Sequence, residues 1–171
     1  MNKGLSVYFL FFFLILFQVL ILKNVAFMNS AFCFAYVLIF LFLPIETRPI
    51  VGMLLAFMVG IAVDLFYDTG GIHGASSILL VYLRSKWLDL VVPQGGFDPG
   101  ESPTIFTAGF RWYLGYAIPL IFVHHTVLFF LEAYDFSLFW ITLRKVIFSM
   151  LFSFFAILLI QYIFLRKTTR S

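Results

Sequence analysis

Long hydrophobic runs separated by short polar segments dominate the chain. A membrane-spanning helix needs about 20 apolar residues, and on that criterion the runs predict about six transmembrane helices. The predicted spans cover residues 5–22, 27–43, 50–66, 72–83, 105–131 and 136–165. The pattern therefore predicts an all-α fold, a polytopic membrane helix bundle that forms a single transmembrane domain over residues 1–171.

Two of these runs allow more than one interpretation. Residues 72–83 are too short to cross a bilayer as one helix. The helix either continues through Trp87 with Arg84 and Lys86 snorkelling to the membrane surface, or it is a tilted or partly re-entrant segment. For residues 136–165 we expect a short surface helix up to Lys145, followed by a span from about Val146.

Prolines mark two further features of the pattern. Pro44 ends the second run and opens a turn that closes at Pro49. Within the fifth run, Pro119 has no N–H to offer the carbonyl group of Gly115, so that carbonyl is left free within its own helix. We expect a kink at this position.

Composition supports the membrane assignment. The chain has 171 residues, of which 63% are hydrophobic and 11% are charged, and its mean hydropathy is +1.07. A soluble domain is about a quarter charged. The net charge of +3 is spread over short segments with no Lys/Arg tract, so the sequence predicts membrane lipid and not nucleic acid as its surroundings. The single cysteine, Cys33, offers neither an internal disulfide nor a metal site.

The distribution of Lys and Arg predicts the orientation. With six crossings, eight basic residues fall on one side of the membrane and three on the other. The first group comprises Lys3, Arg48, Arg84, Lys86, Arg111, Arg166, Lys167 and Arg170, and the second comprises Lys23, Arg144 and Lys145. Because positive residues accumulate on the cytoplasmic side, both termini are expected to be cytoplasmic.

The third run carries a ridge of small residues that ends in a carboxylate. Gly52, Ala56, Gly60 and Asp64 recur every four residues and therefore lie along one helix face. Small residues let a neighbouring helix backbone approach closely, so we expect a tight helix–helix contact there. An ionisable residue within a membrane span is a candidate functional residue.

Three roles remain open for Asp64. It could hold the turn to the next helix by hydrogen bonds, form a buried structural or partner-binding polar site, or take part in ion or proton transport. Asp68 lies one turn further on, and His73 follows the Gly70-Gly71 turn, where it could contact either aspartate. Asp64, Asp68 and His73 are thus the candidate structural polar or partner-binding residues.

The sequence contains no pattern that identifies an enzyme or a cofactor site. His124 and His125 are adjacent, so they point about 100° apart on a helix and are poorly placed to bind one metal ion together. We expect one of the two to form a hydrogen bond inside the bundle. No nucleophile elbow, phosphate-binding loop or dinucleotide fingerprint is present. The sequence therefore predicts a non-enzymatic protein without catalytic residues, metal or cofactor.

The stretch from Gly60 to Ala75, GIAVDLFYDTGGIHGA, resembles the MreD family of rod shape-determining membrane proteins. Members of that family have a helix ending in Gly-x-x-x-Asp, then a glycine-containing turn, then a helix that starts with small residues. The turn from Leu43 to Thr47 and the loop from Pro93 to Gly100 are similar to the form found in Bacteroidota. Length, helix number and the basic C-terminal end extend the resemblance over nearly the whole chain.

The resemblance implies a scaffold of the bacterial inner membrane, in the complex that directs lateral cell-wall synthesis and rod shape. The implied partners are a bitopic MreC-like protein, an MreB-like actin homologue, and the glycan polymerase and transpeptidase of wall elongation. The implied fold is similar to the S components of ECF vitamin transporters. The family has no established catalytic residues to transfer to this chain.

Two other functions compete with the scaffold. A small-molecule transporter subunit of the S-component type commonly docks its partner through alanines four apart on the first helix, and residues 5–22 contain neither Ala nor Gly. That absence counts against transport. An enzyme acting on a lipid-linked substrate is the third possibility, and the sequence offers no polar cluster for it.

Overall fold

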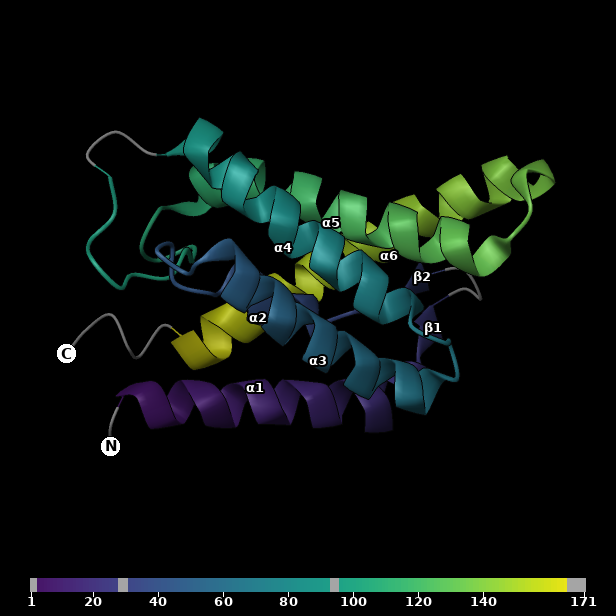
Figure 1. The fold of residues 1–171 in the computed structure, drawn as a ribbon, viewed down its shortest axis with the longest axis horizontal. Coiled ribbons are helices and arrows are strands. Elements are labelled where there is room, and N and C mark those ends of the chain that lie inside the picture. Colours follow the sequence, from purple (N-terminus) through teal and green to yellow (C-terminus); the bar gives the residue numbers. More distant parts are fainter. Residues whose placement is uncertain (1–2, 28–30, 93–95, 166–171) are drawn as a thin grey trace.

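The computed structural model describes residues 3–27, 31–92 and 96–165. The chain is mostly helical, and its long helices run along the long axis of an elongated bundle (Figure 1). The helices are α1 (Lys3–Leu20), α2 (Val37–Leu41), α3 (Pro49–Tyr67), α4 (Ile72–Val91), α5 (Phe110–Ala133) and α6 (Phe139–Ile160). The short elements are the 3-10 turns η1 (Leu22–Asn24) and η2 (Phe136–Leu138), the π-helical turn η3 (Gln161–Leu165), and the strands β1 (Ala26–Phe27) and β2 (Ala31–Phe32). The beginning of α1 and the end of η3 lie at the same end of the bundle (Figure 1).

Membrane-spanning helices are present, as the hydrophobic pattern predicts. In the described part of the chain, three helices are long and apolar enough to cross a bilayer: Pro49–Tyr67, Phe110–Ala133 and Phe136–Leu165. Large apolar side chains such as Met58, Leu65 and Phe155 are exposed on their outer faces. The coarse prediction of a helical membrane protein is therefore confirmed.

The predicted helix over residues 27–43 is wrong. The chain instead forms a small antiparallel hairpin between β1 and β2, continues without regular structure after β2, and becomes helical only in the five residues of α2. Residues 31–43, here called the central segment, are almost entirely buried; Ala35, Tyr36 and Val37 are fully enclosed. The run was apolar because the segment is surrounded by protein, and burial on all sides does not require a helix.

Side chains from α1 and α6 supply the hydrogen bonds that a helix would have made internally. The N–H of Phe32 donates to Ser149 Oγ at 2.9 Å, and the N–H of Phe34 donates to Ser153 Oγ at 2.8 Å. On the other side, Gln18 Nε2 donates to the carbonyl oxygen of Cys33 at 2.9 Å. Non-helical backbone at membrane depth is tolerated only where protein groups satisfy it in this way.

Arg84 stabilises the other end of the central segment. Its Nη2 donates to the carbonyl oxygen of Leu43, and its Nε donates to Tyr116 Oη at 2.7 Å. The Tyr116 hydroxyl donates in turn to the carbonyl oxygen of Leu41 at 2.9 Å. A positive charge beside the last carbonyls of α2 also complements the negative end of that helix. Arg84 is only 3% exposed, so the predicted snorkelling of this side chain is wrong, because buried acceptors satisfy the guanidinium group.

Two predicted boundaries change for related reasons. The segment 72–83 is part of a single helix, α4, that continues to Val91; Arg84 does not end it because its charge faces partners inside the bundle. The predicted surface helix ending at Lys145 is also wrong, since α6 is continuous from Phe139 to Ile160. Lys145 Nζ lies 2.8 Å from Glu132 Oε2, so its charge is paired at the side of the helix.

Helix α5 starts later than predicted and passes through Pro119. Gly109, with φ of +83°, precedes its first residue. The carbonyl oxygen of Gly115, which Pro119 cannot satisfy, accepts a hydrogen bond from Trp87 Nε1 of α4 at 3.1 Å. The proline therefore exposes an acceptor that joins α5 to α4.

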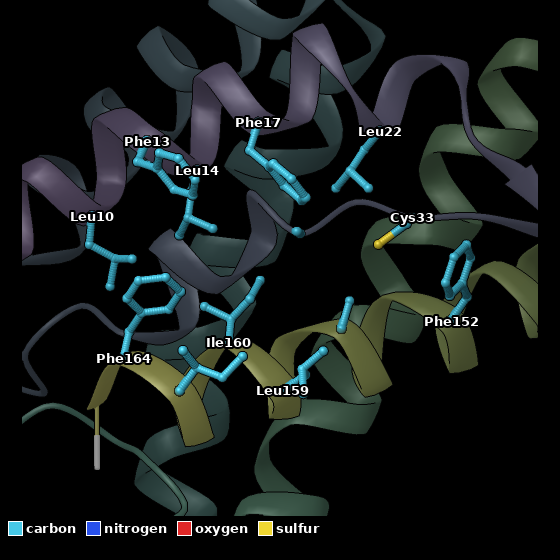
Figure 2. Close-up of a pocket in the computed structure, with 13 residues that line it drawn as sticks. Leu10, Phe13, Leu14, Phe17, Leu22, Cys33, Phe152, Leu159, Ile160 and Phe164 are labelled. Atoms are coloured by element: carbon cyan, nitrogen blue, oxygen red, sulfur yellow. The ribbon is translucent and has the colours of Figure 1, made fainter. Parts of the chain in front are cut away.

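An apolar groove separates α1 from the C-terminal half of α6 and has a volume of about 390 Å³. Figure 2 shows Leu10 and Phe17 of α1 on one wall and Leu159 of α6 with Phe164 of η3 on the other. The remaining lining residues are Phe13, Leu14, Leu22, Cys33, Ala35, Phe152, Ala156, Ile160 and Ile163. Cys33 and Ala35 belong to the central segment, so the groove reaches the middle of the bundle.

The small-residue ridge of α3 packs directly against α4. A Cβ atom added to Gly60 would lie 2.4 Å from the Cα of Gly74, which is too close for any two carbon atoms that are not bonded. A Cβ on Gly52 would lie 2.9 Å from Val81 Cγ1, and Ala56 between them is fully buried. The absence of a side chain at Gly60 is what allows the two backbones to touch.

We predict that Gly60→Ala lowers the thermal unfolding temperature of the purified protein in detergent. Overpacking costs about 1–3 kcal/mol, which exceeds the gain of about 1 kcal/mol from replacing a helical glycine by alanine. Gly115→Ala is the matched control, because a Cβ at that helical glycine meets nothing within 4 Å. A Gly60→Ala protein as stable as the Gly115→Ala protein would refute the close α3–α4 contact.

Candidate functional site

A tight turn connects α3 to α4 and places the candidate polar residues. Asp68 follows the last residue of α3 with φ of +55°, and its N–H donates to the carbonyl oxygen of Asp64. Gly70 and Gly71 continue with φ of +56° and +99°, conformations that glycine adopts without steric cost. The chain therefore reverses within four residues, and the start of α4 returns beside the last turn of α3.

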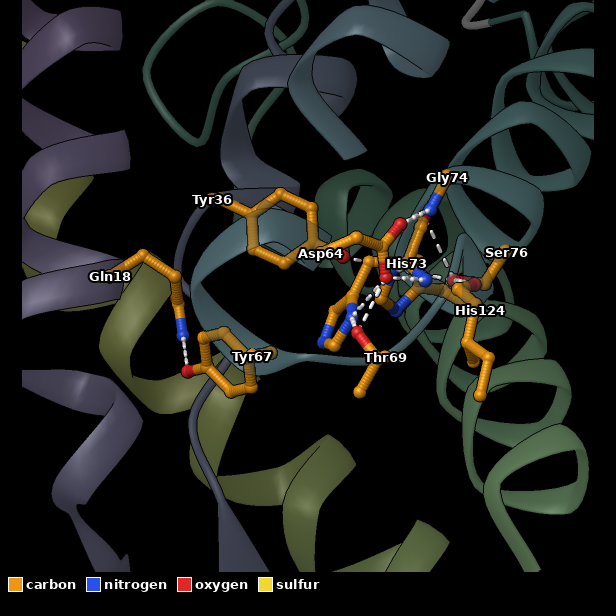
Figure 3. A network of polar contacts seen from close by, with 10 residues as sticks. Gln18, Tyr36, Asp64, Tyr67, Thr69, His73, Gly74, Ser76 and His124 are labelled. Carbon is orange, nitrogen blue, oxygen red and sulfur yellow. Dashed lines mark hydrogen bonds and ion pairs between the residues drawn. The ribbon is translucent and has the colours of Figure 1, made fainter. Parts of the chain in front are cut away.

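The Asp64 carboxylate accepts four hydrogen bonds from this turn and from the start of α4 (Figure 3). Its Oδ1 accepts from Thr69 Oγ1 at 2.6 Å, from the His73 N–H at 3.0 Å and from His73 Nδ1 at 3.1 Å. Its Oδ2 accepts from the N–H of Gly74 at 2.9 Å. Asp64 and His73 are 5% and 2% exposed, so the pair is buried.

These bonds make Asp64 the cap of the next helix. The first N–H groups of a helix have no partner within it. Gly71, the residue before α4, has no side chain that could accept a hydrogen bond from them. Asp64 satisfies two of these N–H groups, while the N–H of Ile72 donates to Thr69 O at 3.2 Å and that of Ala75 to Gly71 O at 2.9 Å. A carboxylate at a helix N-terminus is also favoured by the helix dipole. Asp64 thus fixes the angle between α3 and α4.

The structure brings together only part of the predicted set. Asp64 and His73 are in contact, and Gly60 lies against Gly74, one residue after His73. Asp68 is exposed and lies outside the hydrogen-bonded cluster; its role in the turn comes from its left-handed backbone conformation. The ridge of Gly52, Ala56 and Gly60 is a packing surface that leads to Asp64.

Aromatic rings and histidines from distant parts of the chain form a cluster around this site, which the sequence did not predict. The central segment inserts Phe34 and Tyr36 between α4 and α5; the Phe34 ring lies 5.5 Å from that of His73 and 6.2 Å from that of His124. Tyr36 Oη lies 2.8 Å from His124 Nε2. Figure 3 shows Tyr36, His73 and His124 around one polar centre. The central segment is thereby joined to the α3–α4 turn.

His125 is connected to the central segment by hydrogen bonds through Ser153. His125 Nδ1 lies 2.8 Å from the carbonyl oxygen of Ile121, which can only accept, so Nδ1 carries a proton. In the neutral ring Nε2 is then an acceptor, and it receives the Ser153 hydroxyl proton at 3.0 Å. The Ser153 oxygen is left oriented to accept from the Phe34 N–H. Both histidines of the adjacent pair therefore bond within the bundle, where one was expected.

The missed residues carried a signal in the sequence. Gln18, Ser149 and Ser153 are polar residues inside apolar runs, and Ser149 and Ser153 are four apart, on one face of α6. Polar groups at membrane depth need partners, so these positions could have indicated a neighbouring backbone that lacks its own hydrogen bonds. Gln18 Nε2 also lies 2.8 Å from Tyr67 Oη, which ties α1 to the end of α3.

The cluster has the chemistry of a structural hydrogen-bonding centre. The Asp64 carboxylate accepts from the α3–α4 turn and from the first turn of α4 with both of its oxygen atoms. Within residues 3–27, 31–92 and 96–165, no group of three or more His, Cys, Asp or Glu side chains is arranged to hold a metal ion. The arrangement can fix the positions of α3, α4 and the central segment relative to one another.

Comparison with known proteins gives no match to a family model, a curated protein or a solved structure.

We predict that Asp64→Ala lowers the thermal unfolding temperature strongly and Asp64→Asn lowers it less. Alanine leaves the N–H groups of His73 and Gly74 unpaired, at about 1–3 kcal/mol for each, while Thr69 Oγ1 and His73 Nδ1 can still bond to each other. Asparagine keeps one acceptor oxygen but turns an amide group toward the N–H of Gly74. Asp68→Asn is the control, since Asp68 is exposed at the same turn and asparagine tolerates its left-handed conformation. Equal stability of all three variants would refute the capping role.

Proposed function

We propose that this protein is a non-enzymatic membrane scaffold of the MreD type, which binds the single transmembrane helix of a bitopic MreC-like partner in the groove between α1 and α6. The apolar groove is the observation that carries the proposal. It is lined by hydrophobic side chains along its length, and at membrane depth such a surface is suited to another apolar element.

The lining of the groove favours a helix as the occupant. Cys33, Ala35 and Ala156 are small residues on its inner surface, and small residues allow close approach of a helix backbone in membranes. The large side chains Phe13 and Phe164 at the walls provide packing area on either side. A partner helix bound there would also cover Cys33 and Ala35, which belong to the non-helical part of the central segment.

The polar centre at Asp64 supports a scaffold over a transporter. Asp64 is held by four donors of its own chain and caps α4, which is an arrangement suited to fixing helix positions. In the proposed assembly the MreC-like protein is the direct partner. The MreB-like actin homologue and the glycan polymerase and transpeptidase of wall elongation join the same inner-membrane complex.

We predict that Ala156→Trp reduces recovery of the MreC-like partner when the protein is purified by affinity from its native membranes. The indole would fill the groove and displace the partner helix. Phe155→Trp is the control, because Phe155 is the adjacent residue of α6 and its side chain is 65% exposed on the outer surface. Both variants must accumulate in the membrane at the wild-type level for the comparison to count.

The occupants that compete with a partner helix give distinct results in that experiment. Loss of a second copy of this chain, with the MreC-like protein still recovered, would identify the groove as a self-association site. Unchanged protein recovery with loss of co-purified lipid would identify it as a lipid-binding groove. Either result would overturn the proposed docking site.

We further propose that both termini are cytoplasmic, with the α3–α4 turn on the periplasmic side. The location of the beginning of α1 and the end of η3 at one end of the bundle supports this orientation (Figure 1), as does the excess of Lys and Arg predicted for that side. A reporter active only in the periplasm, fused to the C-terminus, is expected to be inactive, and the same reporter inserted after Asp68 is expected to be active. The reverse pattern would contradict the orientation.

A further inference from the structure

A second cavity, separate from the α1–α6 groove, lies at the end of the bundle that carries the α3–α4 turn. Its volume is about 150 Å³, and its walls include the rings of Phe34, Tyr67 and Phe129 together with His73. A cavity of about this size in a protein interior holds a benzene-sized ring. The aromatic walls are therefore suited to a small flat apolar group.

Two lysines line this cavity. Of the three basic residues predicted for this side of the membrane, Lys23 and Lys145 both belong to its lining, whereas Arg144 does not. Lys23 Nζ lies 5.7 Å from the centre of the Tyr67 ring, and Lys145 Nζ lies 4.5 Å from the centre of the Phe129 ring. Both ammonium groups are thus positioned beside the aromatic walls.

The charge of Lys145 is paired with the carboxylate of Glu132, which another anion can replace. Its Nζ pairs with Glu132 Oε2 at 2.8 Å, and the two side chains are 28% and 45% exposed. An ion pair this accessible to solvent contributes little to stability. An incoming anion could therefore replace Glu132 beside Lys145 at little cost.

His73 belongs to the wall of the same cavity, and both of its ring nitrogens are directed into the protein. Thr69 donates its hydroxyl proton to Asp64, so His73 Nδ1, which faces both, must be the donor in its own contacts. The opposite ring nitrogen, Nε2, has no hydrogen-bond partner among the described residues. That nitrogen is buried within the protein, so His73 contributes ring surface and not a hydrogen-bonding group to the cavity.

We propose that this cavity binds a small aromatic anion, with a carboxylate or phosphate group between Lys23 and Lys145 and a ring between Phe34, Tyr67 and Phe129. The ligand is a soluble aromatic acid, because a glycerophospholipid headgroup has an anionic group but no ring to fill the aromatic walls. This site is independent of the partner that occupies the α1–α6 groove.

The test uses the full-length protein in nanodiscs of phosphatidylcholine, titrated calorimetrically with 4-hydroxybenzoate. Saturable binding is expected, and 4-hydroxybenzyl alcohol, which lacks the carboxylate, is expected not to bind. Lys23→Met and Lys145→Met should each weaken binding about tenfold, the effect of losing one hydrogen bond to a charged group. Glu132→Gln should tighten binding because it removes the competing carboxylate, and Arg144→Met should leave binding unchanged.

Repeating the titration in phosphatidylglycerol nanodiscs tests whether a lipid phosphate occupies the site in place of an aromatic acid. Unchanged binding supports the proposal, and loss of binding there would show that the lipid headgroup occupies the two lysines and would overturn it. The proposal is overturned if 4-hydroxybenzoate does not bind in phosphatidylcholine nanodiscs. It is equally overturned if binding is insensitive to both lysine substitutions, or if Arg144→Met weakens it as much as they do.

Discussion

The need to satisfy the backbone of the central segment is the constraint on which this structure depends. A peptide group without a hydrogen bond costs several kcal/mol in a medium without water, and residues 31–36 form no helix that would satisfy their own. Gln18, Ser149 and Ser153 provide the missing partners from α1 and α6. The positions of these two helices relative to the middle of the bundle therefore follow from the hydrogen bonds that their polar side chains make.

The same arrangement explains why α1 and α6 leave a groove between them. Both helices contact the central segment, so Cys33 and Ala35 separate them at the inner surface while their own side chains form the walls. Helices α3 and α4, by contrast, are in direct contact. Their backbones meet at Gly60 and Gly74, and Asp64 closes the end of that contact by capping α4. One half of the bundle is thus closely packed, and the other retains an apolar surface that another membrane component can cover.

His73 connects the capping site to the second cavity. One ring nitrogen is held by Asp64 and Thr69, and the ring itself lies 4.8 Å from that of Tyr67 at the cavity wall. A ligand in that cavity would therefore lie beside a residue that Asp64 holds at the start of α4. Tyr67 extends the connection to α1 through Gln18, and Gln18 also holds the central segment. Gln18, Tyr67, His73 and Asp64 thus form a connected set of contacts, although they come from three different helices.

The sequence by itself determined the helical membrane character of the chain, the positions of α1 and α3 to within about two residues, and the spacing that places Gly60 and Asp64 on one face of α3. These features depend on local properties: the length of an apolar run and the periodicity of a helix. Asp64 and His73 could be paired in advance because only a short turn separates them. Only the tertiary structure decided that residues 27–43 are not one helix, that Arg84 faces inward and that α6 continues past Lys145. In each case a partner distant in the sequence supplies the hydrogen bond or the opposite charge: Ser149 and Ser153 for the central segment, Tyr116 and Leu43 for Arg84, and Glu132 for Lys145. Hydropathy along a chain records how apolar a segment is, whereas these outcomes depend on which groups meet when the segments pack.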